Sequence, residues 1–230
     1  ARLYTDLMLM TAHKGIVQDV HQVFDFIERP FQPVRFKHLL VAPNEMRTRL
    51  YHMINREIRL AKAGQEAFIR LKLNHIVDEK MVAKLYEANQ AGVQVELCLR
   101  GNCSLIPDIP GYSEGLFING IISRYLEHSR IYIFGNGGDP RYFIGSTDWM
   151  SRNLDRRVEV MTPVYDPDIQ QELDFIVSAG LADTEQGYHV RVSDVRPRRD
   201  DYPAGTPLFN SQQALYKYYL DRKQSENDHD

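Results

Sequence analysis

Residues 125–134, YLEHSRIYIF, are followed by the turn-forming residues GNGGDP at 135–140 and by a second apolar stretch, RYFIGS, at 141–146. Both apolar stretches are rich in Ile, Tyr and Phe, which favour β-strands. The Gly- and Asn-rich segment between them is typical of a tight turn. These three segments together predict a β-hairpin, and the elements around it decide the fold.

The first strand of this hairpin carries two polar residues among apolar ones. Side chains alternate between the two faces of a strand. One face would therefore carry Leu126, His128, Arg130, Tyr132 and Phe134. A single histidine on an apolar face is most often a core residue with a satisfied hydrogen bond, and an arginine beside it can reach solvent at a sheet edge. A functional role for His128 needs support from the rest of the chain.

Strands alternate with helices along the chain, as hydrophobic periodicity and capping residues indicate. We expect strands at 3–12, 35–43, 67–74, 93–101, 120–134, 141–147, 157–164 and 188–193. We expect helices at 15–29, 44–63, 78–92, 166–181 and 210–223, with Asp78 and Asp166 as N-caps. This order predicts an α/β domain with a mixed β-sheet flanked by helices from about residue 35.

Composition limits the classes of function. The 230 residues carry a formal net charge of -3, so no overall basic field indicates a nucleic acid partner. The apolar runs are too short to cross a bilayer. Cys98 and Cys103 lack the spacing of a metal site, which favours a reduced, cytoplasmic setting, with membrane association left open. No signal peptide is visible.

Phosphate-binding residue types gather after the hairpin. Residues 145–157, GSTDWMSRNLDRR, contain Ser146, Asn153, Arg156 and Arg157. Arginine forks match phosphate oxygens, and Ser and Asn donate further hydrogen bonds. Taken alone, this stretch is more typical of a solvated charged loop in which Asp155 pairs with one arginine. Joined to His128 and Arg130 in one hairpin, it favours a phosphate site.

Several common catalytic motifs are missing from the sequence. It contains no GxxxxGK[ST] loop, no GxGxxG that opens a helix, and no GxSxG elbow. It also contains no Cys/His cluster with zinc spacing. A phosphate site in this protein must therefore be built without a glycine-rich phosphate loop.

The order His-x-Arg, Gly-Ser and Asn resembles the second half of the phospholipase D superfamily motif, His-x-Lys followed by Gly-Ser and Asn. A longer resemblance, to the bacterial polyphosphate kinases of the histidine-phosphorylating type, covers nearly the whole chain to about residue 220. It rests on "ARLYTDL", "FKHLLVAP", "LRGNC" and above all on "RYLEHSRIYIF" and "DWMSRNLDRRVE". The fold that this resemblance implies is a phospholipase-D-like α/β domain.

The resemblance also implies a reaction. Enzymes of this family reversibly transfer the terminal phosphate of ATP to inorganic polyphosphate through a phosphohistidine, with Mg²⁺. The residues that match the family's ATP and phosphate contacts are Tyr4, Arg100, His128 and Arg157, with Arg130 beside them. The phosphohistidine and the magnesium ligands would lie upstream of Ala1, so we expect no metal ligand in this chain.

The same resemblance implies a domain organisation. Residues 1–34 would be the tail of a first C-terminal domain and residues 35–220 a second phospholipase-D-like domain. The polar C-terminal residues themselves predict a disordered tail at 221–230. The partners implied are ATP, ADP and polyphosphate, in an intact enzyme that forms a homo-oligomer. Where this family often has an arginine in the loop after "RGNC", this chain has Ile106.

Two alternatives remain open from the sequence. The chain could belong to a phospholipase-D-type phosphodiesterase or nuclease, although Arg130 stands where that motif has its lysine. It could also be a non-catalytic polyanion-binding module. Further candidate ligand contacts are Lys72 and Asn74, because they alternate along the strand predicted at 67–74 and precede the strand's carboxyl end.

Overall fold

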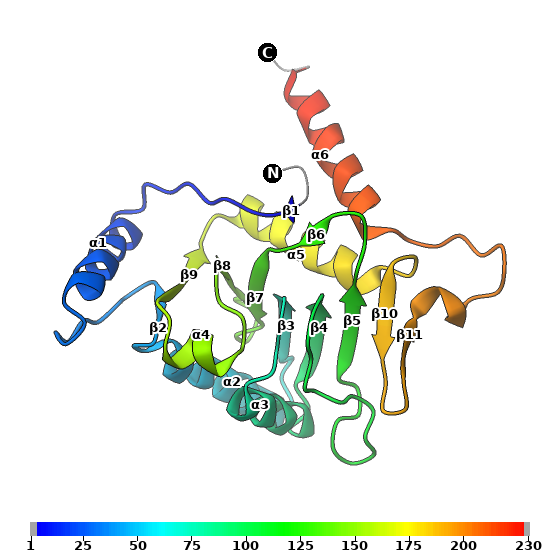
Figure 1. The fold of residues 1–230 in the computed structure, drawn as a ribbon, viewed down its shortest axis with the longest axis horizontal. Coiled ribbons are helices and arrows are strands. Elements are labelled where there is room, and N and C mark those ends of the chain that lie inside the picture. The colour runs from blue at the N-terminus through cyan, green and yellow to red at the C-terminus, as the bar shows by residue number, and fades with distance from the viewer. Residues whose placement is uncertain (1–3, 228–230) are drawn as a thin grey trace.

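The structure, a computed structural model, describes residues 4–227 (Figure 1). Its helices are α1 (Lys14–Glu28), α2 (Met46–Lys62), α3 (Glu79–Gln90), α4 (Ser151–Asp155), α5 (Pro167–Ala182) and α6 (Ser211–Asn227), with a short 3-10 helix η1 (Arg198–Asp201). Its strands are β1 (Tyr4–Thr5), β2 (Leu40–Ala42), β3 (Phe68–Leu73), β4 (Gln94–Leu99), β5 (Phe117–Ile121), β6 (Leu126–Glu127), β7 (Arg130–Phe134), β8 (Arg141–Gly145), β9 (Glu159–Val164), β10 (Gly187–Val190) and β11 (Val195–Pro197).

Nine of these strands form one sheet, in the order β11-β10-β5-β4-β3-β7-β8-β9-β2. Strands β3, β4 and β5 run parallel, while β7, β8, β9 and β2 pair antiparallel to their neighbours. Strands β1 and β6 pair parallel in a separate two-stranded sheet. The predicted α/β fold with a mixed sheet, and the predicted hairpin of β7 and β8, are confirmed.

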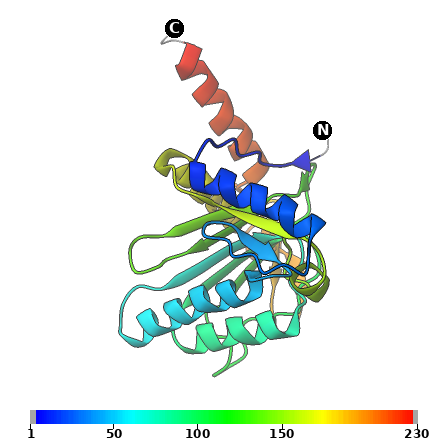
Figure 2. The same ribbon diagram turned by 90° about the vertical axis from the view of Figure 1, so that its left-hand side faces the viewer.

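Helices cover both faces of the large sheet (Figures 1 and 2). On one face α2 and α3 pack through residues such as Leu50 and Leu85 onto Leu71 and Tyr132. On the other face α5 packs through Val177 and its neighbours onto Ile131 and Ile133. Because both faces of β7 are buried, every residue of this strand after Arg130 is apolar. Helix α6 projects away from the sheet (Figure 1).

The N-terminal helix α1 packs beside the outer strand β2 (Figure 2). Its buried residues Ile16, Val23 and Phe26 form a separate small core with Phe36 and Leu39. The Asp19 carboxylate accepts hydrogen bonds from the backbone amides of residues 38 and 39, at 2.6 and 2.9 Å. The segment before β2 is thereby fixed between α1 and the sheet. No helix among residues 4–227 has the length and apolar character needed to cross a membrane.

Three predicted strands are shorter than expected. The strand expected at 120–134 is divided into β5, β6 and β7, and His128 and Ser129 lie between the last two. The strand expected at 3–12 is reduced to β1 in the described residues, because the segment after it has no pairing strand and leaves Met8 90% exposed. Only residues 40–42 of the strand expected at 35–43 pair, with β9.

The C-terminal region is more ordered than predicted. Between the strand expected at 188–193 and the helix expected at 210–223, the structure adds β11 and η1. The disordered tail expected at 221–230 is instead helical to Asn227, and residues 228–230 lie outside the described residues. The physical reason is local: residues 217–227 contain no Gly or Pro and several strong helix formers, so nothing in the sequence ends the helix there.

Asp78 joins three helices at one point. As predicted it is the N-cap of α3, where its carboxylate accepts from the Met81 amide at 3.0 Å. It also accepts two hydrogen bonds from Arg47 of α2, at 2.6 and 2.9 Å, and one from Ser151 of α4 at 2.7 Å. Burial opposes ionisation of this carboxyl, but the hydrogen bonds outweigh burial and lower the pKa of Asp78 to about 2.

We predict that Asp78→Ala lowers the free energy of unfolding by about 3 kcal/mol at pH 7, because it removes a helix cap and one partner of a largely buried ion pair. The control is Asp166→Ala, which removes an N-cap of α5 whose carboxylate accepts only from backbone amides, and should cost about 1 kcal/mol. Urea unfolding measures both values. Equal losses in the two variants would mean that the Arg47 contact contributes nothing.

The Asp78 contribution should depend on pH. A carboxyl whose pKa is lowered by folding stabilises the protein above its unfolded-state pKa of about 4 and loses this effect as the pH falls through its folded-state value. The stability difference between the wild type and Asp78→Ala should therefore shrink between about pH 4 and the folded pKa of about 2. A difference that stays constant over this range would contradict the lowered pKa.

Candidate functional site

The predicted site residues lie at one edge of the large sheet. Strands β3 and β4 end there with Asn74 and Arg100 following them, and β7 begins there with Arg130. The small β1–β6 sheet lies across this edge, below α6 (Figure 1). The carboxyl ends of parallel strands are a common place for ligands in α/β folds.

A chain of hydrogen bonds runs along this edge. Arg100 Nε donates to Asn74 Oδ1 at 2.6 Å, and the Asn74 backbone amide donates to Asp148 Oδ1 at 2.9 Å. Asp148 in turn accepts from Arg130 Nε and Nη2, both at 3.2 Å. Arg130 Nη1 donates to the His128 carbonyl at 2.9 Å. Three predicted residues, Arg100, His128 and Arg130, are thus held together by Asp148 and Asn74.

The His128 imidazole is held by groups from the N-terminal segment. Its Nδ1 lies 3.1 Å from Asp6 Oδ2, and because a carboxylate only accepts, Nδ1 must carry the proton. The Tyr4 ring contacts the imidazole edge-to-face, with ring centroids 5.3 Å apart. The side chain is 35% exposed, and Nε2 lies 3.5 Å from Arg130 Nη1. His128 is therefore an oriented, solvent-accessible histidine and not a buried core residue.

Beneath His128 lies a buried ion pair. Lys72 Nζ, near the carboxyl end of β3, lies 2.9 Å from Glu127 Oε2, and it donates to Ser129 Oγ at 2.9 Å. The Lys72 and Glu127 side chains are only 3% and 7% exposed. Glu127 also accepts from Thr5 Oγ1 at 3.0 Å and from Gln212 Nε2 at 2.6 Å. Lys72 is thus the counter-ion of Glu127 and does not present its ammonium to an open face.

The electrostatics of this pair follow from its partners. Burial raises the pKa of the Glu127 carboxyl, but the nearby Lys72 charge and the hydrogen bonds from Lys72, Gln212 and Thr5 outweigh burial, so the net shift of the pKa is downward. Glu127 is therefore ionised at neutral pH. The Glu127 carboxylate contacts Lys72 of β3, Thr5 of β1 and Gln212 of α6, so it connects these three elements.

A second polar group lies two strands further along the same edge. The Glu159 carboxylate, at the start of β9, accepts from Ser146 Oγ and, at 2.5 Å, from Asn153 Nδ2. Gly145 pairs with Arg130, so this group adjoins the first one, but among residues 4–227 no hydrogen bond joins the two. Arg156 and Arg157 are exposed in the turn between α4 and β9, and among residues 4–227 no hydrogen bond links their side chains to His128.

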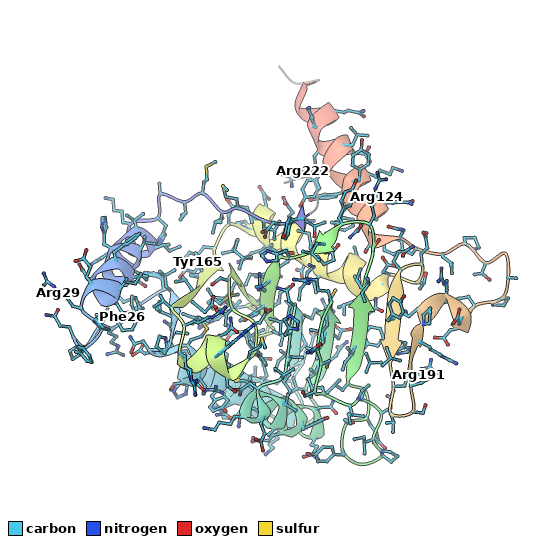
Figure 3. The ribbon with its side chains drawn as sticks, viewed as in Figure 1. Phe26, Arg29, Arg124, Tyr165, Arg191 and Arg222 are labelled. Carbon is cyan, nitrogen blue, oxygen red and sulfur yellow. The ribbon has the colours of Figure 1, made fainter. Side chains whose placement is uncertain are left out.

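An open hollow adjoins the His128 group. It has a volume of about 440 Å³ and is lined by Tyr4, Arg100, Arg124 and Tyr125 together with neighbouring residues of the 121–127 segment. The Arg124 guanidinium stacks over the Tyr125 ring at 5.4 Å, and Arg124 lies near the lower turns of α6 (Figure 3). Two arginines and two tyrosines around one hollow offer both cationic and aromatic contacts to a ligand.

Sequence reasoning missed five residues of this region: Asp6, Arg124, Glu127, Asp148 and Glu159. All five stand next to or within the motifs that were singled out, as in "TDL", "SRYLEHS", "STDWM" and "RRVEV". Proximity to a motif was therefore the available signal. The sequence could not predict which residues these five contact. Glu127 and Lys72, for example, are far apart in the sequence and meet only in the folded sheet.

The chain is similar to proteins of one known family. A family model described as polyphosphate kinase C-terminal domain 2 matches residues 39–212. The polyphosphate kinase of Escherichia coli strain K12 is 43% identical over 98% of this chain and 33% of its own length. The polyphosphate kinase of Vibrio parahaemolyticus is 42% identical over 95% of this chain and 31% of its own length.

A solved structure also matches. The crystal structure of polyphosphate kinase from Porphyromonas gingivalis is similar with a TM-score of 0.87 and 35% sequence identity, over 94% of this chain and 33% of that chain. The chain thus spans about a third of the length of these relatives.

The Lys72–Glu127 pair leads to a prediction on stability. Glu127→Gln leaves a buried ammonium without a counter-ion and should lower the free energy of unfolding by about 3 kcal/mol. Lys72→Met should cost a similar amount, while the double variant should cost clearly less than the sum of the two. The coupling energy should be about 2 kcal/mol or more, measured by urea unfolding of the four proteins.

The matched control is the pair Arg70–Glu96, which joins β3 to β4 at 2.6 Å but is 30% and 18% exposed. Its coupling energy in an Arg70→Met, Glu96→Gln cycle should be below about 1 kcal/mol. Additive losses for Lys72 and Glu127, with no coupling larger than that of the control, would show that burial does not strengthen their interaction.

Proposed function

The chain belongs to the polyphosphate kinase family, and we propose that it forms the C-terminal part of an enzyme that reversibly transfers the terminal phosphate of ATP to inorganic polyphosphate. The observation that carries this proposal is the hydrogen-bond chain that holds Arg100, Arg130 and His128 at one sheet edge. Phosphoryl transfer depends mainly on positioning and on positive charge near the phosphate oxygens, which such an edge can supply.

The two arginines have different roles in this proposal. Asp148 holds Arg130 through two hydrogen bonds and offsets part of its charge, so Arg130 mainly fixes the position of the His128 backbone. Arg100 is held by the neutral Asn74 amide and forms no ion pair in the described part of the chain, so its full charge is available to a phosphate. Tyr4, 48% exposed beside Arg100, would contact the nucleotide.

His128 would act on the phosphoryl group that is transferred. The Asp6 carboxylate accepts a hydrogen bond from Nδ1 and sets the orientation of the ring, so Nε2 remains for the substrate. A protonated Nε2 can donate to a phosphate oxygen or give its proton to a leaving oxygen. The covalent phosphohistidine would be a different residue, upstream of this chain. Arg157 would approach from the start of β9, at the same edge of the sheet.

We assign residues 35–220 to one phospholipase-D-like domain and residues 1–34 to the tail of a preceding domain. The match of the family model to residues 39–212 supports the first assignment. The two prolines Pro30 and Pro33 support a boundary between them. Partners would be ATP, ADP and polyphosphate and not nucleic acid, in a cytoplasmic homo-oligomer.

The family implies Mg²⁺, but the carboxylates of this edge do not fit a magnesium site. Glu127, Asp148 and Glu159 each accept hydrogen bonds from cations or amides and belong to separate groups. Within residues 4–227 no cluster of three or more Asp, Glu, His or Cys residues is arranged to hold a metal ion. We therefore derive no step through a metal bound by this chain.

We predict that His128→Ala in the full-length enzyme lowers the turnover number of polyphosphate synthesis about 10²- to 10⁴-fold, as for loss of an acid–base group. The Michaelis constant for ATP should change much less, and the melting temperature should stay near that of the wild type because the imidazole is partly exposed. Steady-state kinetics and thermal melting measure these quantities.

The control for this variant is His21→Ala, which removes an exposed histidine of α1 and should leave turnover unchanged. Acid-labile phosphate should still appear on the His128→Ala protein after an alkaline quench, because the phosphohistidine lies elsewhere. Complete loss of this label would make His128 the covalent site. Normal turnover by an early-melting variant would make His128 a structural residue only.

A further inference from the structure

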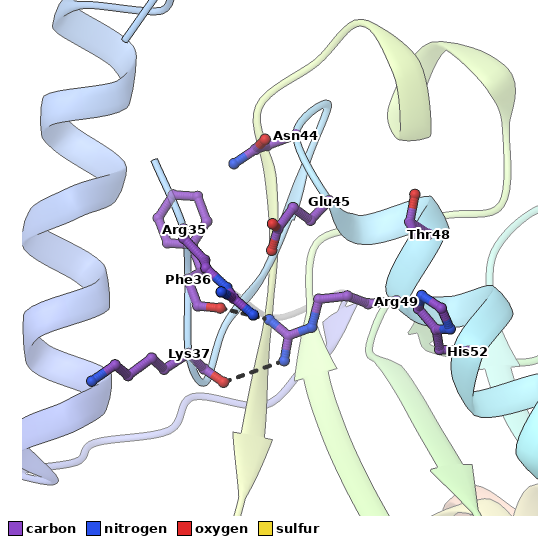
Figure 4. A pocket seen from close by; sticks show the side chains of 8 residues that line it. All are labelled: Arg35, Phe36, Lys37, Asn44, Glu45, Thr48, Arg49 and His52. Atoms are coloured by element: carbon purple, nitrogen blue, oxygen red, sulfur yellow. Dashed lines mark hydrogen bonds between the residues drawn. The ribbon is translucent and has the colours of Figure 1, made fainter. Parts of the chain in front are cut away.

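A second cationic hollow lies at the other end of the strand order, beside the outer strand β2. Its volume is about 800 Å³, and its lining side chains are Arg35, Phe36, Lys37, Asn44, Glu45, Thr48, Arg49 and His52 (Figure 4). Strands β8 and β9 separate β2 from β7, so this hollow does not adjoin the His128 group. None of these residues has a role in the proposed reaction.

The cations of this hollow lack counter-ions. Arg35 and Arg49 turn their guanidinium groups toward one another, and Lys37 points to the other side of the segment (Figure 4). No ion pair links Arg35, Lys37 or Arg49 to a carboxylate in the part of the chain that the structure describes. Glu45 is the one acidic residue of the lining. Facing guanidinium groups repel each other unless an anion lies between them.

Arg49 is held in place without being neutralised. Its guanidinium donates to the carbonyl oxygens of Leu39 at 2.5 Å, Phe36 at 3.2 Å and Lys37 at 3.4 Å. Burial lowers the pKa of Arg49 and outweighs the opposing effects of the Glu45 and Asp19 charges, and the charge of Arg141 lowers this pKa by a smaller amount. Arg49 is half-buried, and a partly desolvated cation whose hydrogen-bond partners are all neutral carbonyls is a favourable contact for an incoming anion.

The positive region continues past this hollow. Lys37 and Arg49 also line an adjoining hollow of about 440 Å³, together with Arg141 and Tyr165. Asp139 is the one acidic residue of this second lining, so cations outnumber carboxylates in both hollows. Tyr165 is labelled in Figure 3 and shows that this adjoining hollow lies at the outer side of the sheet. The first turn of α2 lines the first hollow, and Glu45 gives that helix no side-chain cap, so its positive end adds to the field. The cations follow a track and not a single point.

We infer that this track, from Arg35 through Lys37 and Arg49 to Arg141, is a second binding site for an extended phosphate anion. An orthophosphate ion could span only one pair of these cations, whereas a chain of phosphates can contact them in sequence. The choice of inorganic polyphosphate as the natural ligand rests on the proposed function. The anion site itself rests only on the arrangement of these residues.

Hydrogen exchange of the full-length protein, measured by mass spectrometry with and without tripolyphosphate, tests the site. The method shows which peptides of the chain the ligand protects. Exchange in peptides covering residues 35–52 should slow on addition of tripolyphosphate, and orthophosphate should have a weaker effect at equal concentration. ATP, whose triphosphate is blocked at one end by the nucleoside, should slow exchange at 126–134 and should protect 35–52 less than tripolyphosphate does. Arg35→Gln removes an exposed cation and should raise the tripolyphosphate concentration needed for half-protection of 35–52 about 10-fold.

The control variant is Arg59→Gln, which removes an exposed cation of α2 outside both hollows and should leave that concentration unchanged. Protection at 126–134 without protection at 35–52 would overturn the second site and leave the proposed function standing. Protection at 35–52 that Arg35→Gln does not weaken would also overturn it. Protection at 35–52 alone would support the second site and count against the proposed function.

Discussion

The ion pair of Lys72 and Glu127 is the contact on which the functional edge depends. Two opposite charges lie almost fully buried, at a place where the central strand β3 would otherwise carry an apolar side chain. Removal of either charge would leave the other uncompensated in a medium that solvates it poorly. The chain must therefore bring Glu127 to Lys72, and it cannot continue as a regular strand from β6 into β7.

The position of His128 follows from this constraint. Because Glu127 also accepts from Thr5 and Gln212, the N-terminal segment and α6 are fixed at the same point. The next residue along the chain is His128, and the fixed N-terminal segment supplies Asp6 and Tyr4 to its imidazole. The Asp148 carboxylate is paired with Arg130, whereas Arg100 is held by a neutral amide and keeps an uncompensated positive charge at this edge. A negatively charged substrate would be attracted to that place.

Local patterns predicted the elements well, but they could not predict long-range partners. The turn-forming residues at 135–140 and the N-caps Asp78 and Asp166 depend on near neighbours, and the structure has them as expected. By contrast, Asp148 joins Asn74 to Arg130, and Glu127 meets Lys72 across the sheet. The prediction of a single strand over 125–134 was wrong for the same reason. Strand propensity is a local property, and it does not include the contact that a buried charge makes with a distant residue.

The most direct test of the account is a crystal structure of the full-length protein with a non-hydrolysable ATP analogue. Phosphate oxygens should lie within about 3 Å of His128 Nε2 and of the Arg100 guanidinium, with Asp6 still bonded to Nδ1. The Lys72–Glu127 pair should be unchanged beneath them. A phosphate chain bound away from this edge, with His128 and Arg100 free of any ligand contact, would contradict the account.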